Sequence, residues 1–348
     1  MTAFRRWGAE VARLALPIVL AGVLFVLLFA TLALLGLPAA SSSLLILEGA
    51  VGDKFGLART LVLATPLVIA GLGIALAWRA GMYNIGGEGQ YISGGLAAGA
   101  LVQLVPGGGW ALMFMMLAAG FAGGAFYGWI AGWLHVRRGV QLVVSTILLN
   151  FVALQLLSWA VTGPLQETSR SLPQSAPVPA SAMLPRFDSQ TDLHAGVLLA
   201  LFAAIAVQVF LWRTPAGFEL RFVGASPGAA RANRIPWQRV QERAMILSGG
   251  LCGFAGAVQL AGVQRELSMS FAENWGFIAI PVALLGGLSP LGIVAAGLYF
   301  GALLAGSKNL ERFTPGAGAI VYVIQGLAVL ALVAFQVWRS RRREARVD

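Results

Sequence analysis

The sequence predicts an all-α, polytopic helical membrane protein with about ten transmembrane segments, some of them broken or re-entrant. Of its 348 residues 58% are hydrophobic and 11% charged, whereas about a quarter of the residues in a typical soluble domain are charged. Mean hydropathy is +0.80, and apolar runs of about 20 residues, the length that crosses a bilayer as a helix, recur along the chain. Helices satisfy their own backbone groups in lipid. This composition excludes a soluble enzyme.

The apolar runs divide evenly between the two halves of the chain. The first half supplies five candidate spans: Leu14–Leu37, Thr60–Trp78, Ile85–Leu104, Gly109–Leu134 and Val140–Gly163. The second half supplies five more: Ala195–Trp212, Met245–Gln264, Gly276–Leu288, Leu291–Gly306 and Ala319–Trp338. The run Leu14–Leu37 is longer than the apolar region of an ordinary signal peptide, which favours a span over a cleaved leader.

The basic residues predict the orientation of these spans. With the N-terminus in the cytoplasm, ten spans place 17 of the 24 Lys and Arg residues on the cytoplasmic face. Such an excess is the positive-inside pattern of membrane proteins, and it accounts for the net charge of +10. Nucleic-acid binding is therefore unnecessary to explain the charge. We expect a multi-pass inner-membrane protein with both termini in the cytoplasm and lipid around its spans.

Two hydrophilic connections are long enough to carry structure of their own within one predicted transmembrane domain, 1–348. Residues 164–194 are expected to form an external loop with short helical pieces. Residues 213–244 are expected on the cytoplasmic face, where Ser226 with Pro227, and then Pro236, predict two short helices along the membrane. That shape suits docking of a soluble partner; an ordinary basic loop is the alternative.

The most unusual local sequence is G-M-Y-N-I-G-G-E-G-Q, residues 81–90. Its glycines are poor material for a regular lipid-facing helix. One interpretation is a broken helix that lines a translocation path, with Asn84, Glu88 and Gln90 as its polar groups. The alternative is a structural clamp in which Asn84 and Glu88 satisfy freed backbone amides and hold two helices together.

A comparable interruption follows in the second half, at Gly286, Gly287, Ser289 and Pro290, and paired interruptions are typical of transporters built from repeats. Two further polar groups of a proposed span, Asn150 and Gln155, are candidates for solute contact or for hydrogen bonds within the core. Glycines recur every fourth residue from Gly120 to Gly132, and Gly249 and Gly253 repeat that spacing. These stripes predict close helix packing.

Groups for covalent chemistry are sparse. The chain has one cysteine and two histidines, with no pattern of metal-ligand spacing and no phosphate-binding loop. We therefore expect no catalytic residues, metal or cofactor in a non-enzymatic protein. Energy for any transport would then come from an ion gradient or from another subunit.

Three segments carry a family resemblance. Residues 81–90, the stretch F-V-G-A-S-P-G-A-A-R at 222–231, and P-V-A-L-L-G-G-L-S-P-L-G at 281–292 resemble membrane subunits of bacterial ABC importers. The superfamily is that of the ribose and branched-chain amino acid permeases, in its nucleoside and simple-sugar branch. The resemblance implies an ATPase-docking role for the second stretch, carried by Gly224, Ser226, Pro227, Ala230 and Arg231.

The resemblance also implies partners. These are a cytoplasmic ABC ATPase with two fused domains, a second homologous permease, and a periplasmic or lipoprotein solute-binding protein. The expected function is a bacterial inner-membrane permease subunit that imports a nucleoside or simple-sugar-like solute. A branched-chain amino acid or other sugar permease, and a gradient-driven secondary carrier, remain as alternatives.

Overall fold

The structure is a computed structural model that describes residues 38–105 and 107–314, with isolated positions near either end. These residues fall into two compact units, one comprising 57–302 and the other 1–56 with 303–348. The expected spans Leu14–Leu37 and Ala319–Trp338 lie almost wholly outside the described residues. Within the described residues the chain is helical, and its only strand-like pairings are isolated bridges. The all-α class is confirmed.

Six helices of the described chain are long and apolar enough to cross a membrane. They are α3 (Lys54–Arg79), α5 (Gly109–Arg138), α6 (Leu142–Thr162), α7 (Gly196–Arg213), α10 with its π-helical extension η2 (Trp237–Gln264), and α12 (Pro290–Phe313). Two further predicted spans form α4 (Gly87–Leu104), which is as long as α7, and the shorter helix α11 (Trp275–Leu285). All eight described spans are therefore helical, although they do not all have bilayer-crossing length and hydropathy.

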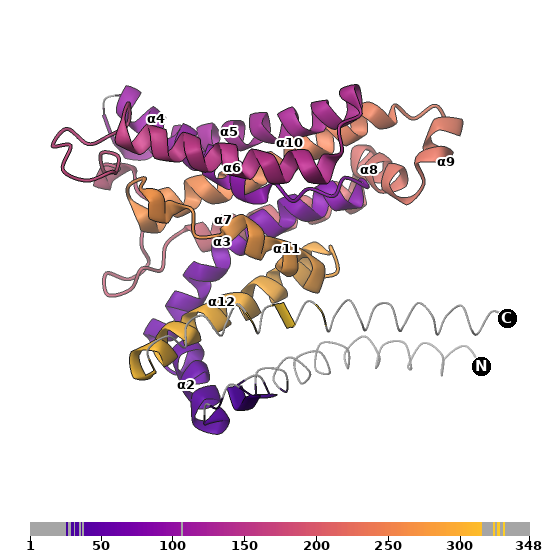
Figure 1. Cartoon of the computed structure of the whole chain (residues 1–348). Coiled ribbons are helices and arrows are strands. Elements are labelled where there is room, and N and C mark those ends of the chain that lie inside the picture. The colour runs from indigo at the N-terminus through magenta and orange to yellow at the C-terminus, as the bar shows by residue number, and fades with distance from the viewer. Residues whose placement is uncertain are drawn as a thin grey trace, which may run out of the picture. The chain divides into compact units, whose positions relative to one another are not determined.

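Helices α4, α5 and α10 form the centre of the unit 57–302 and run side by side in Figure 1. The predicted glycine stripes lie at their contacts. A Cβ atom on Gly124 of α5 would overlap the backbone of Gly249 and Gly253 on α10, and one on Gly94 of α4 would also overlap Gly253. Backbones this close leave no room for side chains, so the stripes determine how the three helices pack.

Both predicted helix interruptions are present. Helix α3 ends at Arg79 and α4 begins at Gly87, with a non-helical connection between them. The second break separates α11 from α12, where Gly287 and Leu288 both have positive φ, 61° and 54°. A left-handed backbone cannot continue an α-helix. The chain therefore turns at Gly287 and Leu288, between the end of α11 and the start of α12.

The segment 213–244 differs in part from the two short helices predicted for it. It contains α8 (Pro215–Ala225) and α9 (Pro227–Ala232). Pro236 does not start a separate surface helix; it precedes α10, which begins at Trp237 and continues into the membrane-length helix. Thr214 and Ser226 cap α8 and α9 through their side-chain oxygens, and a proline occupies the first turn of each, as helix starts favour.

Residues 164–194 form an irregular loop with a single 3-10 turn, η1 (Ala180–Ala182). Isolated bridges join Gln166 to Ser175 and Arg186 to His194. The Glu167 carboxylate accepts hydrogen bonds from Ser169, Ser171 and Gln174, which lower its pKa to about 2. The loop is thus organised by local hydrogen bonds, with little helix.

The unit formed by 1–56 and 303–348 contains a helix that the sequence did not predict, α2 (Ala39–Val51). Its Leu45 carbonyl accepts a hydrogen bond from Asn309 Nδ2 at 2.9 Å. A Cβ on Gly306 would overlap Ile46. These contacts pack α2 on the C-terminal part of α12.

Candidate functional site

Asn84 is the centre of a buried polar network in the connection between α3 and α4. Its Nδ2 donates to Gln90 Oε1 and to Ser248 Oγ of α10, both at 2.9 Å. Its Oδ1 accepts from the backbone amide of Gly86 at 2.8 Å, and its own carbonyl accepts from Trp78 Nε1 at 3.1 Å. Asn84 and Gln90 are almost completely buried. The amide of Asn84 therefore has its donors and acceptor engaged within the protein.

Glu88, in the first turn of α4, binds the start of another helix. One carboxylate oxygen accepts from the backbone amide of Asn274 at 3.1 Å, and the other accepts from that of Gly276 at 2.6 Å. Both amides belong to the beginning of α11. A carboxylate at a helix N-terminus satisfies unpaired amides and the positive end of the helix dipole. Here one carboxylate serves two helices, because Glu88 also lies at the N-terminus of α4.

The two helix starts touch through glycine. A Cβ atom on Gly276 would overlap the backbone of Gly87 and Glu88. No other residue type leaves this space free, so the glycine allows the Glu88 carboxylate to reach both amides. The geometry is that of the structural clamp considered from the sequence.

Of the two candidates on α6, the structure brings only Asn150 to this cluster. Its Oδ1 accepts from the Gly89 amide at 2.8 Å and its Nδ2 donates to the Ile85 carbonyl at 3.0 Å. Gln155 is exposed on α6 and lies apart from these hydrogen bonds. Asn84, Glu88, Gln90 and Asn150 thus form one buried cluster, hereafter the α4 cluster, in which side chains replace the backbone partners that the break in the helix removes.

The segment that resembles an ATPase-docking loop is preorganised. Ser226 Oγ accepts from the Ala229 amide at 3.2 Å at the start of α9. Ala230 is fully buried, and the Arg231 guanidinium lies over the ring of Trp237, 4.5 Å from its centroid. Pro227 and Arg231 are exposed. One face of α9 is therefore fixed to the protein and the other faces solvent.

This segment touches the break before α4. A Cβ on Gly224, at the end of α8, would overlap the backbone of Arg79 and Ala80, and Gly81 lies directly against Gly224. Arg79 in turn donates from Nε to the Leu288 carbonyl at 2.7 Å. A continuous line of contacts therefore joins the docking segment, the end of α3 and the break between α11 and α12.

A basic pocket of about 560 Å³ opens beside α9 and the start of α10. Its lining includes four arginines: Arg137, Arg231, Arg234 and Arg239. Arg137 is paired with Glu242 at 2.6 Å. The surplus positive charge favours an acidic partner surface at this point.

Among the described residues no group of three His, Cys, Asp or Glu side chains is placed to hold a metal ion. Sequence reasoning missed Ser248, Asn274 and Gly276, which are far from the α4 cluster along the chain. It also missed Arg79. A charged residue at the end of an apolar span, two positions before Gly81, was the available signal for Arg79.

Comparison with known proteins gives a family. The family model described as the permease component of branched-chain amino acid transport systems matches residues 56–333. The glucose ABC transporter permease protein of Haloferax volcanii is 35% identical, over 83% of this chain and 79% of the relative.

Two further relatives belong to nucleoside systems. The guanosine ABC transporter permease protein NupP of Bacillus subtilis is 29% identical over 85% of this chain and 86% of the relative. A nucleoside ABC transporter permease protein of Lactococcus lactis is 30% identical over 76% of this chain and 75% of the relative. No solved structure matches. The chain is a multi-pass membrane protein that belongs to the family of branched-chain amino acid transport system permease components.

Proposed function

We propose that the chain is the permease subunit of an ATP-driven ABC importer for a nucleoside or simple-sugar-like solute. The observation that carries this proposal is the docking segment. It presents an exposed, capped helix to solvent and packs through Gly224 on the end of α3. A soluble ATPase that moves α9 would displace the contacts of α3 and of the α11–α12 break. The named substrates of the relatives, glucose, guanosine and nucleosides, support the solute class.

The proposal includes three partners. A cytoplasmic ABC ATPase, of the fused double-domain kind, supplies the energy and binds at α9 and the basic pocket. A second homologous permease completes the path. A periplasmic or lipoprotein solute-binding protein delivers the solute to the outer face. The chain itself supplies no catalytic group in this scheme, and hydrolysis belongs to the ATPase.

We propose that the α4 cluster forms part of the wall of the solute translocation path. The Glu88 oxygens and the Asn84 amide are engaged by protein atoms, which supports the clamp over direct solute contact for these two residues. Gln155, exposed on α6, retains free hydrogen-bonding capacity for solute or for a neighbouring subunit. The variant Gln155→Leu tests this role. A changed KM for solute with unchanged thermal stability would support solute contact.

The test is transport by the co-purified complex in proteoliposomes with binding protein present. We expect uptake of labelled nucleoside or sugar to require ATP on the side of the membrane to which the ATPase binds. Uptake should continue when a protonophore is added. Uptake that needs no ATP and is abolished by the protonophore would replace the importer with a gradient-driven carrier.

The family description favours one alternative solute class, branched-chain amino acids. Competition in the same vesicles separates the two. Excess unlabelled guanosine or glucose should inhibit uptake, whereas excess leucine should not. Inhibition by leucine alone would reassign the solute.

A further inference from the structure

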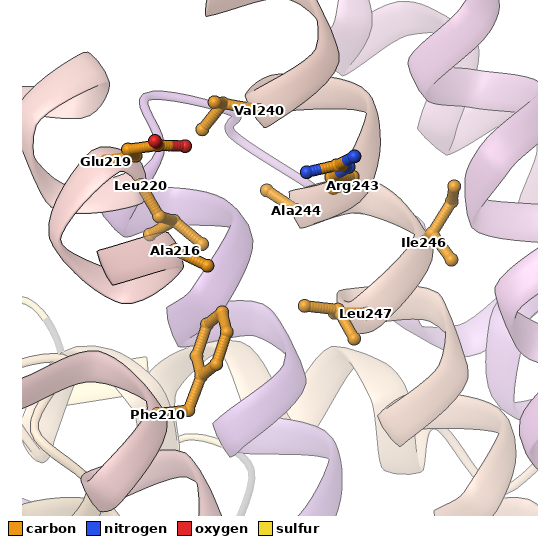
Figure 2. A pocket seen from close by; sticks show the side chains of 9 residues that line it. All are labelled: Phe210, Ala216, Glu219, Leu220, Val240, Arg243, Ala244, Ile246 and Leu247. Atoms are coloured by element: carbon orange, nitrogen blue, oxygen red, sulfur yellow. The ribbon is translucent and has the colours of Figure 1, made fainter. Parts of the chain in front are cut away.

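A second pocket, of about 220 Å³, lies between α7, α8 and α10. Nothing in the proposed transport cycle uses it. Figure 2 shows its nine lining residues: Phe210, Ala216, Glu219, Leu220, Val240, Arg243, Ala244, Ile246 and Leu247. Seven of these side chains are apolar. The other two have opposite charges.

The charged and apolar ends of the pocket follow the direction of the helices. On α10, Leu247 lies one turn farther along the membrane-length helix than Arg243, and on α7, Phe210 precedes the terminal Arg213. In Figure 2 Phe210 and Leu247 lie at one end and Glu219 and Val240 at the other. The pocket therefore has an apolar end toward the membrane interior and a charged end toward the helix boundary. A membrane lipid has the same polarity along its length.

Glu219 and Arg243 line the same pocket without pairing. Glu219 on α8 points toward α10, which carries Arg243 (Figure 2). Neither a hydrogen bond nor an ion pair joins the two side chains in the part of the chain that the structure describes. One anionic and one cationic group at the mouth of an apolar pocket fit a headgroup that carries both charges.

The surroundings place this mouth at a membrane–water boundary. Trp212, at the end of α7, is exposed and has the Arg221 guanidinium over its ring at 4.1 Å from the centroid. Phe218 on α8 is also exposed and stacks on Phe222. Exposed aromatic side chains with neighbouring arginines are typical of the interfacial layer.

We propose that this pocket binds a zwitterionic phospholipid with a primary amine, of the phosphatidylethanolamine class. Arg243 binds the phosphate and Glu219 accepts hydrogen bonds from the ammonium group. The upper part of an acyl chain lies against Phe210 and Leu247. A basic pocket alone would favour an anionic headgroup, but the carboxylate of Glu219 disfavours a second negative charge and favours an N–H donor. The proposal requires only that the chain spans a membrane and is independent of the ATPase.

Lipid retention tests the assignment. The purified complex in detergent is incubated with an equimolar mixture of dioleoyl phosphatidylethanolamine, phosphatidylcholine and phosphatidylglycerol, and retained lipid is measured by mass spectrometry. Phosphatidylcholine is the matched probe, because it carries the same charges but no N–H donor. We expect phosphatidylethanolamine to be retained about tenfold over phosphatidylcholine, the ratio that one charge-assisted hydrogen bond gives.

Variants locate the site. Glu219→Leu should reduce phosphatidylethanolamine retention to the phosphatidylcholine level, because leucine offers no acceptor to the ammonium group. Arg243→Gln should lower retention of both lipids. Arg213→Gln, at the end of α7 but outside the pocket lining, is the control and should retain the wild-type ratio. Equal retention of the two zwitterionic lipids by the wild-type complex would overturn the proposal without any variant.

Two other outcomes would also overturn it. Preferential retention of phosphatidylglycerol would make the pocket an anionic-lipid site. Crosslinking of the Ile246→Cys variant to a second permease chain, with no lipid retained, would make the pocket a subunit interface.

Discussion

The Glu88 carboxylate accepts a hydrogen bond from the backbone amide of Gly276 across the junction of α4 and α11. Two helix N-termini meet at this point, and their positive ends would repel each other without a negative charge between them. Gly276 permits the close approach of the two helices, and the negative charge of Glu88 offsets the repulsion between their positive ends. The break before α4 is thereby tied to the start of α11, whose other end leads into the break before α12.

Replacing Glu88 removes the acceptor for two buried amides. We expect Glu88→Ala to lower the free energy of unfolding by about 3 kcal/mol, since hydrogen bonds to charged groups contribute roughly 1.5–3 kcal/mol each. Glu88→Gln keeps one acceptor oxygen and should lose less. The measurement is the apparent Tm of the detergent-purified protein. Glu273→Gln is the matched control, because that exposed carboxylate precedes Asn274 by one residue; a drop as large as that of Glu88→Gln would argue against the clamp.

Gly276→Ala should separate α4 from α11. The added methyl group overlaps the Gly87–Glu88 backbone, and overpacking of this kind costs about 1–3 kcal/mol. Gly228→Ala provides the comparison, because no atom lies within 4 Å of a Cβ built there and alanine is the better helix former. Equal thermal stabilities of the two variants would show that the junction relaxes freely.

Replacing Arg79 should affect the coupling of solute transport to ATP hydrolysis more than it affects basal ATP hydrolysis. Arg79→Met removes the hydrogen bond to Leu288, and we expect solute-stimulated ATPase activity to fall several-fold while basal activity persists. Arg221→Met is the control for lost stacking, because the guanidinium groups of Arg79 and Arg221 both lie over Trp212. Only Arg79 also donates a hydrogen bond to Leu288, in the break between α11 and α12. If the two variants lose coupling to the same extent, the Leu288 bond has no special role.

Charge reversal at the docking segment tests its electrostatics. Arg231→Glu places an acid beside the basic pocket and should weaken binding of the ATPase about tenfold or more, since unlike charges at an interface become like charges. Co-purification and ATPase assays at two salt concentrations measure this. Membrane insertion should be unchanged. Arg170→Glu, in the loop 164–194, is the control; unaltered coupling in Arg231→Glu would exclude this contact.

The pH dependence of stability should report His194, which is buried just before α7. Its Nδ1 accepts from the Gly196 amide at 3.0 Å, so the ring is neutral in the fold. Burial, and secondly the charge of Arg186, lower its pKa to about 4. The unfolded chain has a pKa of about 6.5 and binds a proton first. Stability is therefore complete above pH 6.5 and falls as the pH is lowered toward 4.

The measurement for His194 is the apparent Tm across that pH window. His194→Asn should flatten the profile between pH 6.5 and 4, since asparagine can still accept a hydrogen bond but does not titrate there. His135→Asn, at the other histidine of the chain, should leave the slope in place. A wild-type profile without a slope in this window would refute the assignment.

Several features followed from the sequence because they depend on local pattern. Apolar runs defined the eight described spans, and the glycines of residues 81–90 and 286–287 marked the two breaks. Glycine spacing along Gly120–Gly132 predicted the packing of α5. The helix α9 was indicated by Ser226 and Pro227, whose capping role needs only neighbouring residues. By contrast α2, whose packing partner is α12, had no sequence signal that distinguished it from a loop.

The sequence by itself determined that the chain is a helical membrane protein with two broken segments and a basic connection at 213–244. Hydropathy, charge and glycine content suffice for this because they act through the surrounding solvent and the local backbone. Only the tertiary structure showed which groups Glu88 binds. Its partners, Asn274 and Gly276, are almost 190 residues away along the chain, and a carboxylate facing a solute and one capping a helix look alike in sequence. The three-dimensional packing of α4 on α11 supplies the capping contacts, because it brings two unpaired amides to the carboxylate.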